Sequence, residues 1–230
     1  MFKRSVFFII LLISFQSIVI AQEVNAYDAQ GKRHGLWQKK YKNSKQLRYT
    51  GTFDHGKEIG VFKFYDHKGE HPTALKTYTP NSDMLDVVFY TTDGKKVSEG
   101  KMKGRDREGK WITYHQDGTS LMITSHYQKG LLEGLKEVYY IDGTLALKET
   151  YINGKKEGVS IEYTKESNIL RELNYKDDKL EGFAKMYNGL GILEVEGFYK
   201  NNRKHGMWKY YKNGKLEKEL KFPQNKIGVQ

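Results

Sequence analysis

Apolar and aromatic residues recur along this chain in short alternating runs that turn residues separate. Residues 130–153 show one complete unit: an apolar run that ends on Tyr139, an Asp142-Gly143 pair, and a second run that ends on Tyr151. An Asp-Gly pair between two such runs predicts a β-hairpin with a type I′ turn, because both residues tolerate a positive φ. A single hairpin is only marginally stable in water, so the rest of the chain is expected to repeat it.

The unit does recur, eight times, at a spacing of 24 or 25 residues. The second turn glycine or its replacement stands at Gly35, Gly60, Leu85, Gly109, Gly134, Gly158, Gly182 and Gly206. A tyrosine follows five residues later, or six in the first unit, at Tyr41, Tyr65, Tyr90, Tyr114, Tyr139, Tyr163, Tyr187 and Tyr211. This periodicity predicts an all-β fold, an elongated antiparallel meander of about eight β-hairpin repeats and roughly 16 strands in one twisted or rolled sheet.

Residues 71–85 depart from the repeat. They hold two of the three prolines, and Leu85 stands where the turn glycine is expected. Because proline removes a donor from the strand ladder, we expect a bulge, an insertion loop or a break in the sheet here. Two interpretations stay open: a pivot between the halves of the array, and decay of the repeat without function.

The start of the chain has the features of an export signal. Lys3 and Arg4 precede the apolar run 6–20, and small residues end it at Ala21. Residues 1–21 are therefore predicted to be a signal peptide that is cleaved before Gln22, which places the protein in the periplasm, the cell envelope or the medium. An uncleaved anchor is the alternative, but the apolar run is short of the roughly 20 residues that a membrane-spanning helix needs.

Four segments follow from these observations. They are the signal peptide 1–21, an N-terminal lead-in or cap over 22–30, the repeat array 31–222 and a C-terminal tail over 223–230.

Charge widens the range of partners. The net charge is +11, and it becomes +9 without Lys3 and Arg4. A basic exported protein suits anionic lipid headgroups, acidic polysaccharide or an acidic protein surface, although simple solubility explains the charge equally well. Nucleic acid is not expected as a partner, because export removes the chain from it.

Residues with catalytic chemistry do not form a recognisable set. The chain has no cysteine, no Gly-x-Ser-x-Gly elbow and no His-Glu-x-x-His motif. Its seven histidines lie in or beside turns without ligand spacing, and recurring glutamates such as Glu99 and Glu149 are explained by balance with neighbouring lysines. We therefore predict a protein that is not an enzyme, with no catalytic, cofactor-binding or metal-binding residues.

Aromatic residues at fixed repeat positions are the candidates for a partner-binding surface. If their face is exposed, they suit protein hot spots or stacking on sugar rings; if it is interior, they form the core. The candidates are Trp37, Phe62, Trp111, Trp208 and Tyr210.

The motif Gly-Lys-x-x-Gly-x-Trp-x-x-Tyr-x-x-(Asp/Asn)-Gly, matched best at 31–41, 105–118 and 202–214, resembles the MORN repeat variant family, which includes YwqK-type antitoxin components. This resemblance implies an elongated β-hairpin scaffold that associates with protein partners or phospholipid membranes, and an immunity role for YwqK-type members. The predicted function is a non-enzymatic exported scaffold that binds a protein partner, antitoxin-like in the narrower form. Adhesion to anionic membrane lipid or acidic polysaccharide is the alternative.

Overall fold

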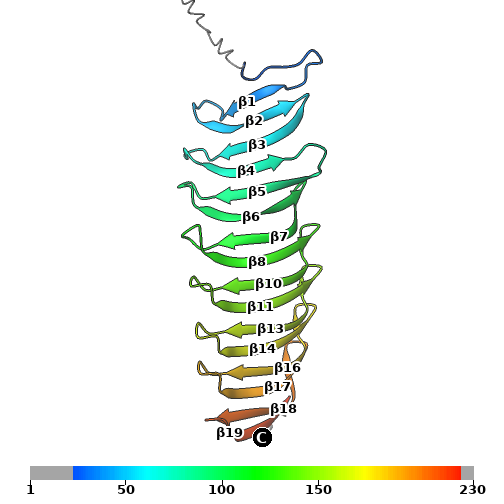
Figure 1. The fold of residues 1–230 in the computed structure, drawn as a ribbon. Helices are drawn as coiled ribbons and strands as arrows, with labels where there is room; N and C mark the ends of the chain where they lie inside the picture. Colours follow the sequence, from blue (N-terminus) through cyan, green and yellow to red (C-terminus); the bar gives the residue numbers. More distant parts are fainter. Residues whose placement is uncertain (1–22, 224–230) are drawn as a thin grey trace, which may run out of the picture.

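The computed structural model describes residues 23–223. The predicted signal peptide, residues 1–21, and all but the first residue of the predicted tail lie outside this part of the chain. Within residues 23–223 the protein is one open antiparallel sheet with no helix, whose hairpins follow one another along a single axis (Figure 1). The predicted all-β meander is confirmed.

The sheet contains 19 strands, of which β9, β12 and β15 are two residues long, and the other 16 strands form the hairpins. These eight hairpins, numbered one to eight below, are β1–β2, β3–β4, β5–β6, β7–β8, β10–β11, β13–β14, β16–β17 and β18–β19. The strand bounds are β1 Gly35–Lys40, β2 Leu47–Asp54, β3 Lys57–Tyr65, β4 Pro72–Tyr78, β5 Met84–Tyr90, β6 Lys96–Lys103, β7 Asp106–Tyr114, β8 Leu121–Gln128, β9 Leu131–Leu132, β10 Gly134–Tyr139, β11 Leu145–Ile152, β12 Lys155–Lys156, β13 Gly158–Tyr163, β14 Ile169–Lys176, β15 Lys179–Leu180, β16 Gly182–Tyr187, β17 Leu193–Lys200, β18 Arg203–Lys212 and β19 Lys215–Phe222.

Tight turns join consecutive hairpins. Asn153 and Gly154 both have a positive φ, 49° and 80°, and they connect β11 to β12. Lys129-Gly130, Asp177-Asp178 and Asn201-Asn202 also have two positive φ values in the corresponding connections. Two consecutive residues of this kind define the type I′ turn, whose twist matches that of the flanking strands. Turns of this kind therefore join the repeat units, and one more, Asn213-Gly214 with φ of 51° and 74°, lies within hairpin eight between β18 and β19.

The turn at Asp142-Gly143 differs from the predicted type I′ geometry. Only Gly143 has a positive φ there, 87°. Its N–H donates to the carbonyl of Tyr140, and the N–H of Tyr140 donates in turn to the carbonyl of Thr144. The Asp142 carboxylate accepts a hydrogen bond from the N–H of Thr144 at 3.0 Å, a contact that Asp side chains commonly make in turns. The prediction of a type I′ turn at this pair is wrong, because the connection is longer and only its last turn residue is left-handed.

The stretch 71–85 leaves the sheet unbroken. Strands β4 and β5 pair continuously from Ala74 opposite Phe89 to Tyr78 opposite Leu85, with no register shift. A five-residue connection, 79–83, replaces the two-residue turns found at the other junctions. Of the three expected irregularities the insertion loop is present, and a register shift lies at Pro72–Ala74 in the pairing of β4 with β3, whereas the sheet is not broken in this stretch. Continuous pairing argues against a pivot between the two halves.

The loss of the turn glycine explains this difference. Gly60 and Gly109 begin their hairpins in the left-handed conformation, with φ of 65° and 64°, and the pairing to the preceding strand shifts register beside each of them. Leu85 has a side chain, for which that conformation is unfavourable, and it pairs directly with Tyr78. A residue change at one position thus decides whether the junction carries a bulge.

The two edges of the sheet are protected in different ways. At the N-terminal edge the lead-in lies along β1: the N–H of Asn25 donates to the carbonyl of Leu36, and the Asn25 side chain accepts from the N–H of Gln38. At the opposite end β19 pairs with β18 alone and alternates charges along its length. Charged side chains on an edge strand oppose pairing with another chain.

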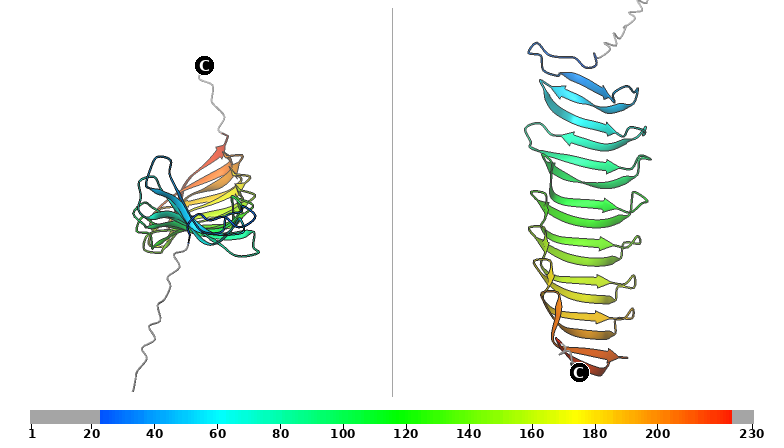
Figure 2. Two further views of the ribbon diagram at one scale, coloured as in Figure 1. Left: turned by 90° about the horizontal axis from the view of Figure 1, so that it is seen from above. Right: turned by 180° about the vertical axis from the view of Figure 1, so that it is seen from behind.

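The sheet is bent when viewed along its long axis (Figure 2), and its two faces differ in exposure. The face that carries Trp37, Phe62, Trp111 and Trp208, called the aromatic face below, holds most of the buried side chains. The opposite face carries Val61, Val159, Phe198 and Met207, all of which are exposed. The core therefore lies on one face of a single sheet.

Candidate functional site

The predicted partner-binding aromatics lie in the interior of the aromatic face. The exposed fractions of Trp37, Phe62, Trp111 and Trp208 are 9%, 2%, 1% and 0%. Tyr210 is half-buried, and its hydroxyl accepts a hydrogen bond from the Lys204 ammonium at 2.9 Å. Of the two interpretations left open by the sequence, the structure shows the core. The rings of the four buried residues are closed to direct contact with a partner.

Glycines in the neighbouring strands make this burial possible in a single sheet. Gly100 is the register partner of Trp111, and a Cβ placed on it would lie 2.5 Å from the indole ring. A Cβ placed on Gly197 would lie 2.4 Å from the Trp208 ring, and a Cβ placed on Gly51 would lie 2.4 Å from the Phe62 ring. Each large ring therefore rests on bare backbone of the preceding hairpin.

Basic side chains cover the other side of each indole ring. The guanidinium carbons of Arg33 and Arg107 lie 4.9 and 4.2 Å from the ring centroids of Trp37 and Trp111, and the Lys204 ammonium lies 4.2 Å from Trp208. In all three cases the basic residue precedes the tryptophan by four positions. Cations at this distance attract the face of the ring. The pattern Arg/Lys-x-Gly-x-Trp was available in the sequence, and our reasoning overlooked it.

The aromatic column is interrupted by charge in hairpins five and six. The position of the tryptophan is taken there by Lys136 and then by Ser160, and Glu149 is 3% exposed in the strand between them. The Glu149 carboxylate binds the Lys156 ammonium, lies 3.5 Å from that of Lys136 and accepts a hydrogen bond from the Tyr151 hydroxyl at 2.9 Å. This buried ion cluster replaces ring-on-glycine packing in the middle of the array.

Burial and pairing act in opposite directions on Glu149. Burial raises the pKa of its carboxyl, but the hydrogen bonds from Lys156 and Tyr151 and the lysine charges outweigh burial, so the pKa is lowered from its ordinary value of 4.5. Burial, followed by the neighbouring Glu149 carboxylate, raises the pKa of the Tyr151 hydroxyl. Glu149 is therefore a charged acceptor and Tyr151 a neutral donor at neutral pH.

The repeat glutamates of the opposite face are engaged by tyrosines. Tyr187 donates to Glu172 at 3.0 Å and Tyr211 donates to Glu196 at 2.7 Å, while Tyr114 donates to Glu99 in the same way. Burial, then the hydrogen bond to Glu172, raises the pKa of Tyr187 to about 12. These carboxylates hold the repeat tyrosines of hairpins four, seven and eight in place, which gives them a structural role.

An apolar strip runs over the opposite face of the last three hairpins. Phe183 and Phe198 are register partners whose ring centroids lie 5.1 Å apart, with Phe198 52% exposed. Met207 on β18 and Val159 on β13 lie on the same face and are 46% and 47% exposed, with Asn174 on β14 between Val159 and Phe183. We call Val159, Phe183, Phe198 and Met207 the apolar strip. It offers the contact area that the buried tryptophans do not.

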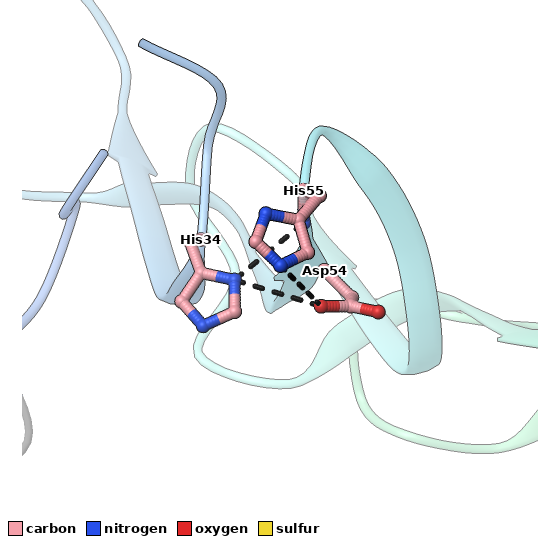
Figure 3. A group of neighbouring side chains, drawn as sticks. All are labelled: His34, Asp54 and His55. Carbon is pink, nitrogen blue, oxygen red and sulfur yellow. Dashed lines mark hydrogen bonds and ion pairs between the residues drawn. The ribbon is translucent and has the colours of Figure 1, made fainter. Parts of the chain in front are cut away.

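One group of side chains has the composition of a metal site. His34, Asp54 and His55 come together at the turn edge of the first two hairpins, with ligand atoms within 4.8 Å of one another (Figure 3). Sequence reasoning found no histidines at ligand spacing, and the structure corrects this. His34 and His55 are 21 residues apart, close to one repeat, so neighbouring turns bring them side by side.

These features define an open β-hairpin-repeat protein over residues 23–223. The family model described as MORN repeat variant matches residues 204–222, which lie in hairpin eight, so the resemblance seen in the sequence is confirmed over those residues. A comparison with curated proteins finds no match to the chain. The part of the chain that the structure describes contains no helix long and apolar enough to cross a membrane.

Proposed function

We propose that the protein is a non-enzymatic, exported β-repeat scaffold that binds a protein partner through the apolar strip. The observation that carries this proposal is the register pair of half-buried Phe183 and exposed Phe198, with exposed Met207 on the same face of the next hairpin. Exposed aromatic and methionine side chains are enriched where proteins bind one another. The buried aromatic face supplies the rigid support beneath this surface.

The charges beside the strip favour a protein over a lipid surface. Lys185 pairs with Glu196 across β16 and β17, and Lys209 pairs with Glu219 across β18 and β19. Because positive and negative side chains both border the apolar strip, it suits a partner whose apolar patch is bordered by acidic and basic groups of its own. Binding to an anionic membrane would be favoured by lysines that have no acidic partner.

The resemblance to YwqK-type antitoxin components makes a toxin the narrower choice of partner. Export follows from the basic and apolar pattern of residues 1–21. Export can be tested separately from partner binding. The mass of the chain recovered from the envelope fraction should correspond to a start at Gln22, and recovery of the full chain from the cytoplasm would contradict export.

Site-specific crosslinking tests the binding surface. A photoreactive phenylalanine analogue at Phe198 should crosslink one saturable protein partner in an envelope extract, and the Phe198→Ser variant should then bind the purified partner at least about tenfold more weakly. Leu190→Ser is the matched control, because Leu190 is 77% exposed in the turn between β16 and β17. Equal loss in both variants, or no saturable crosslink, would contradict the proposal.

Adhesion to an anionic surface is the second candidate function. The chain without Lys3 and Arg4 has a net charge of +9. Vesicles with anionic headgroups should then sediment the protein at low salt and release it steeply as salt rises, whereas zwitterionic vesicles should not bind it. Binding to vesicles that Phe198→Ser leaves unchanged would favour this function over the protein partner.

A further inference from the structure

We propose that His34, Asp54 and His55 form a binding site for one divalent transition-metal ion of the zinc class at the N-terminal end of the array. Nδ1 of His34 lies 3.6 Å and Nε2 of His55 lies 3.8 Å from Oδ1 of Asp54. Two ligand atoms bound to one tetrahedral zinc ion are separated by about 3.4 Å. The three side chains in Figure 3 therefore need only a small inward movement to share an ion.

The backbone holds the three ligand-bearing segments together without an ion. His34 immediately precedes β1, Asp54 ends β2, and His55 begins the turn to β3. The N–H of His34 donates to the carbonyl of Ala26 at 3.0 Å, and the N–H of Gly56 donates to the carbonyl of Arg33 at 2.8 Å. The site is therefore organised before any ion binds, which lowers the cost of assembling it.

Asp28 orients the His55 ring. Its Oδ2 lies 2.6 Å from Nδ1 of His55, while Oδ1 accepts hydrogen bonds from the N–H groups of Gln30 and Lys32 at 2.9 and 2.8 Å. Only 7% of the Asp28 side chain is exposed. A carboxylate that accepts from one imidazole nitrogen leaves the lone pair of the other nitrogen free, an arrangement found behind metal-bound histidines. Asp28 is thus a positioning residue.

The remaining polar groups of the site are acceptors. Nδ1 of His34 accepts a weak hydrogen bond from the N–H of His55 at 3.5 Å, so this nitrogen carries its lone pair, and an ion bound there would replace that hydrogen bond. Two imidazole nitrogens and the Asp54 carboxylate thus lie within 4.8 Å of one another, and a cation could accept an electron pair from each of them. Two imidazoles and one carboxylate favour zinc and its neighbours over magnesium or calcium.

The site is open. Between 49% and 60% of the three ligand side chains is exposed, which leaves a fourth coordination position for water or for a ligand from a bound molecule. The location is at the opposite end of the array from the apolar strip, so metal binding and partner binding can be tested independently.

Calorimetric titration of untagged, chelator-treated mature protein with zinc sulfate tests the proposal. We expect one ion per chain, and at least tenfold weaker binding for His34→Ala and for His55→Ala. His205→Ala is the matched control, because His205 occupies the same turn position in hairpin eight, and it should bind zinc like the unchanged protein. Asp28→Asn should weaken binding by about 10 to 100-fold, as expected for a group that orients a ligand.

Circular dichroism of each variant distinguishes lost ligands from lost structure. A His34→Ala, His55→Ala double variant with an unchanged spectrum and unchanged zinc affinity would overturn the proposal. Absence of binding to the unchanged protein at millimolar zinc would overturn it as well. If a single alanine variant unfolds, zinc-dependent thermal stabilisation of Asp28→Asn gives the deciding measurement, and stabilisation equal to that of the unchanged protein counts against the site.

Discussion

The indole ring of Trp111 lies directly on the backbone of Gly100, its register partner in the preceding hairpin. The same contact joins Trp208 to Gly197. A one-layer sheet has no second layer to cover its core, so close approach to bare backbone buries one side of each ring. Stability of the array is therefore expected to depend on residues that have no side chain.

Gly100→Ala should destabilise the protein. The added Cβ would stand 2.5 Å from the Trp111 ring, which has to move or be strained. Overpacking of this kind costs about 1 to 3 kcal/mol of the free energy of unfolding, measurable by urea denaturation. Gly189→Ala is the control, because nothing lies within 4 Å of its Cβ position and its φ is not positive. Equal stability of the two variants would show that the ring accommodates the methyl group freely.

Lys204 should be energetically coupled to Trp208. The ammonium lies 4.2 Å from the centroid of a ring that is 0% exposed. In a double-mutant cycle with Lys204→Met and Trp208→Leu, we expect a coupling free energy of about 1 kcal/mol. Lys209→Met, on the opposite face, should show no coupling to Trp208→Leu. Coupling near zero for Lys204 would reduce its role to covering the ring with its alkyl stem.

Glu149→Gln should be among the most destabilising conservative changes in the array. It leaves the Lys136 and Lys156 ammonium groups without their shared carboxylate on the aromatic face. We expect the free energy of unfolding to fall by about 2 to 3 kcal/mol. This is less than for a fully buried ion pair, because both lysine side chains are partly exposed. Asp177→Asn breaks the exposed pair with Lys155 and should leave the free energy of unfolding nearly unchanged.

The contribution of Glu149 should also depend on pH. Folding lowers the pKa of its carboxyl below the ordinary value of 4.5, so the unfolded chain binds the proton more readily in acid. The stabilisation is complete above that value and is lost as pH falls through the folded-state pKa. Urea denaturation should therefore show the gap between unchanged protein and Glu149→Gln closing below pH 4.5. A gap that stays constant down to pH 3 would contradict a carboxylate role.

Most of the fold could be predicted from residues that lie close together in the sequence. Turn residues recur at fixed spacing, and strand residues alternate between them, so the number of hairpins follows from the sequence. Gly134 opposite Tyr151 and Gly158 opposite Tyr175 show the same register within successive units. The Asp142-Gly143 turn type was mispredicted because the length of the connection depends on where pairing stops, which the two residues do not encode.

The functional surfaces were less accessible to sequence reasoning. Trp111 and Phe198 are both large and aromatic, and both occupy strand positions of a repeat, yet one is 1% exposed and the other 52%. The alternation of side chains along a strand places the two residues on opposite faces, but it does not indicate which face is buried. The cation that covers each tryptophan was readable four residues upstream, whereas the ion cluster around Glu149 combines residues from three strands.

The sequence by itself determined a repeated hairpin, its length, its register and the junction where a leucine replaces glycine, because all of these depend on residues a few positions apart. Only the tertiary structure decided which face is buried and which side chains meet across hairpins. His34 and His55 stand 21 residues apart and come together through the stacking of neighbouring turns. The physical reason is that contacts between units, such as the packing of the Trp111 ring on Gly100, join residues of different hairpins, so no single unit contains them.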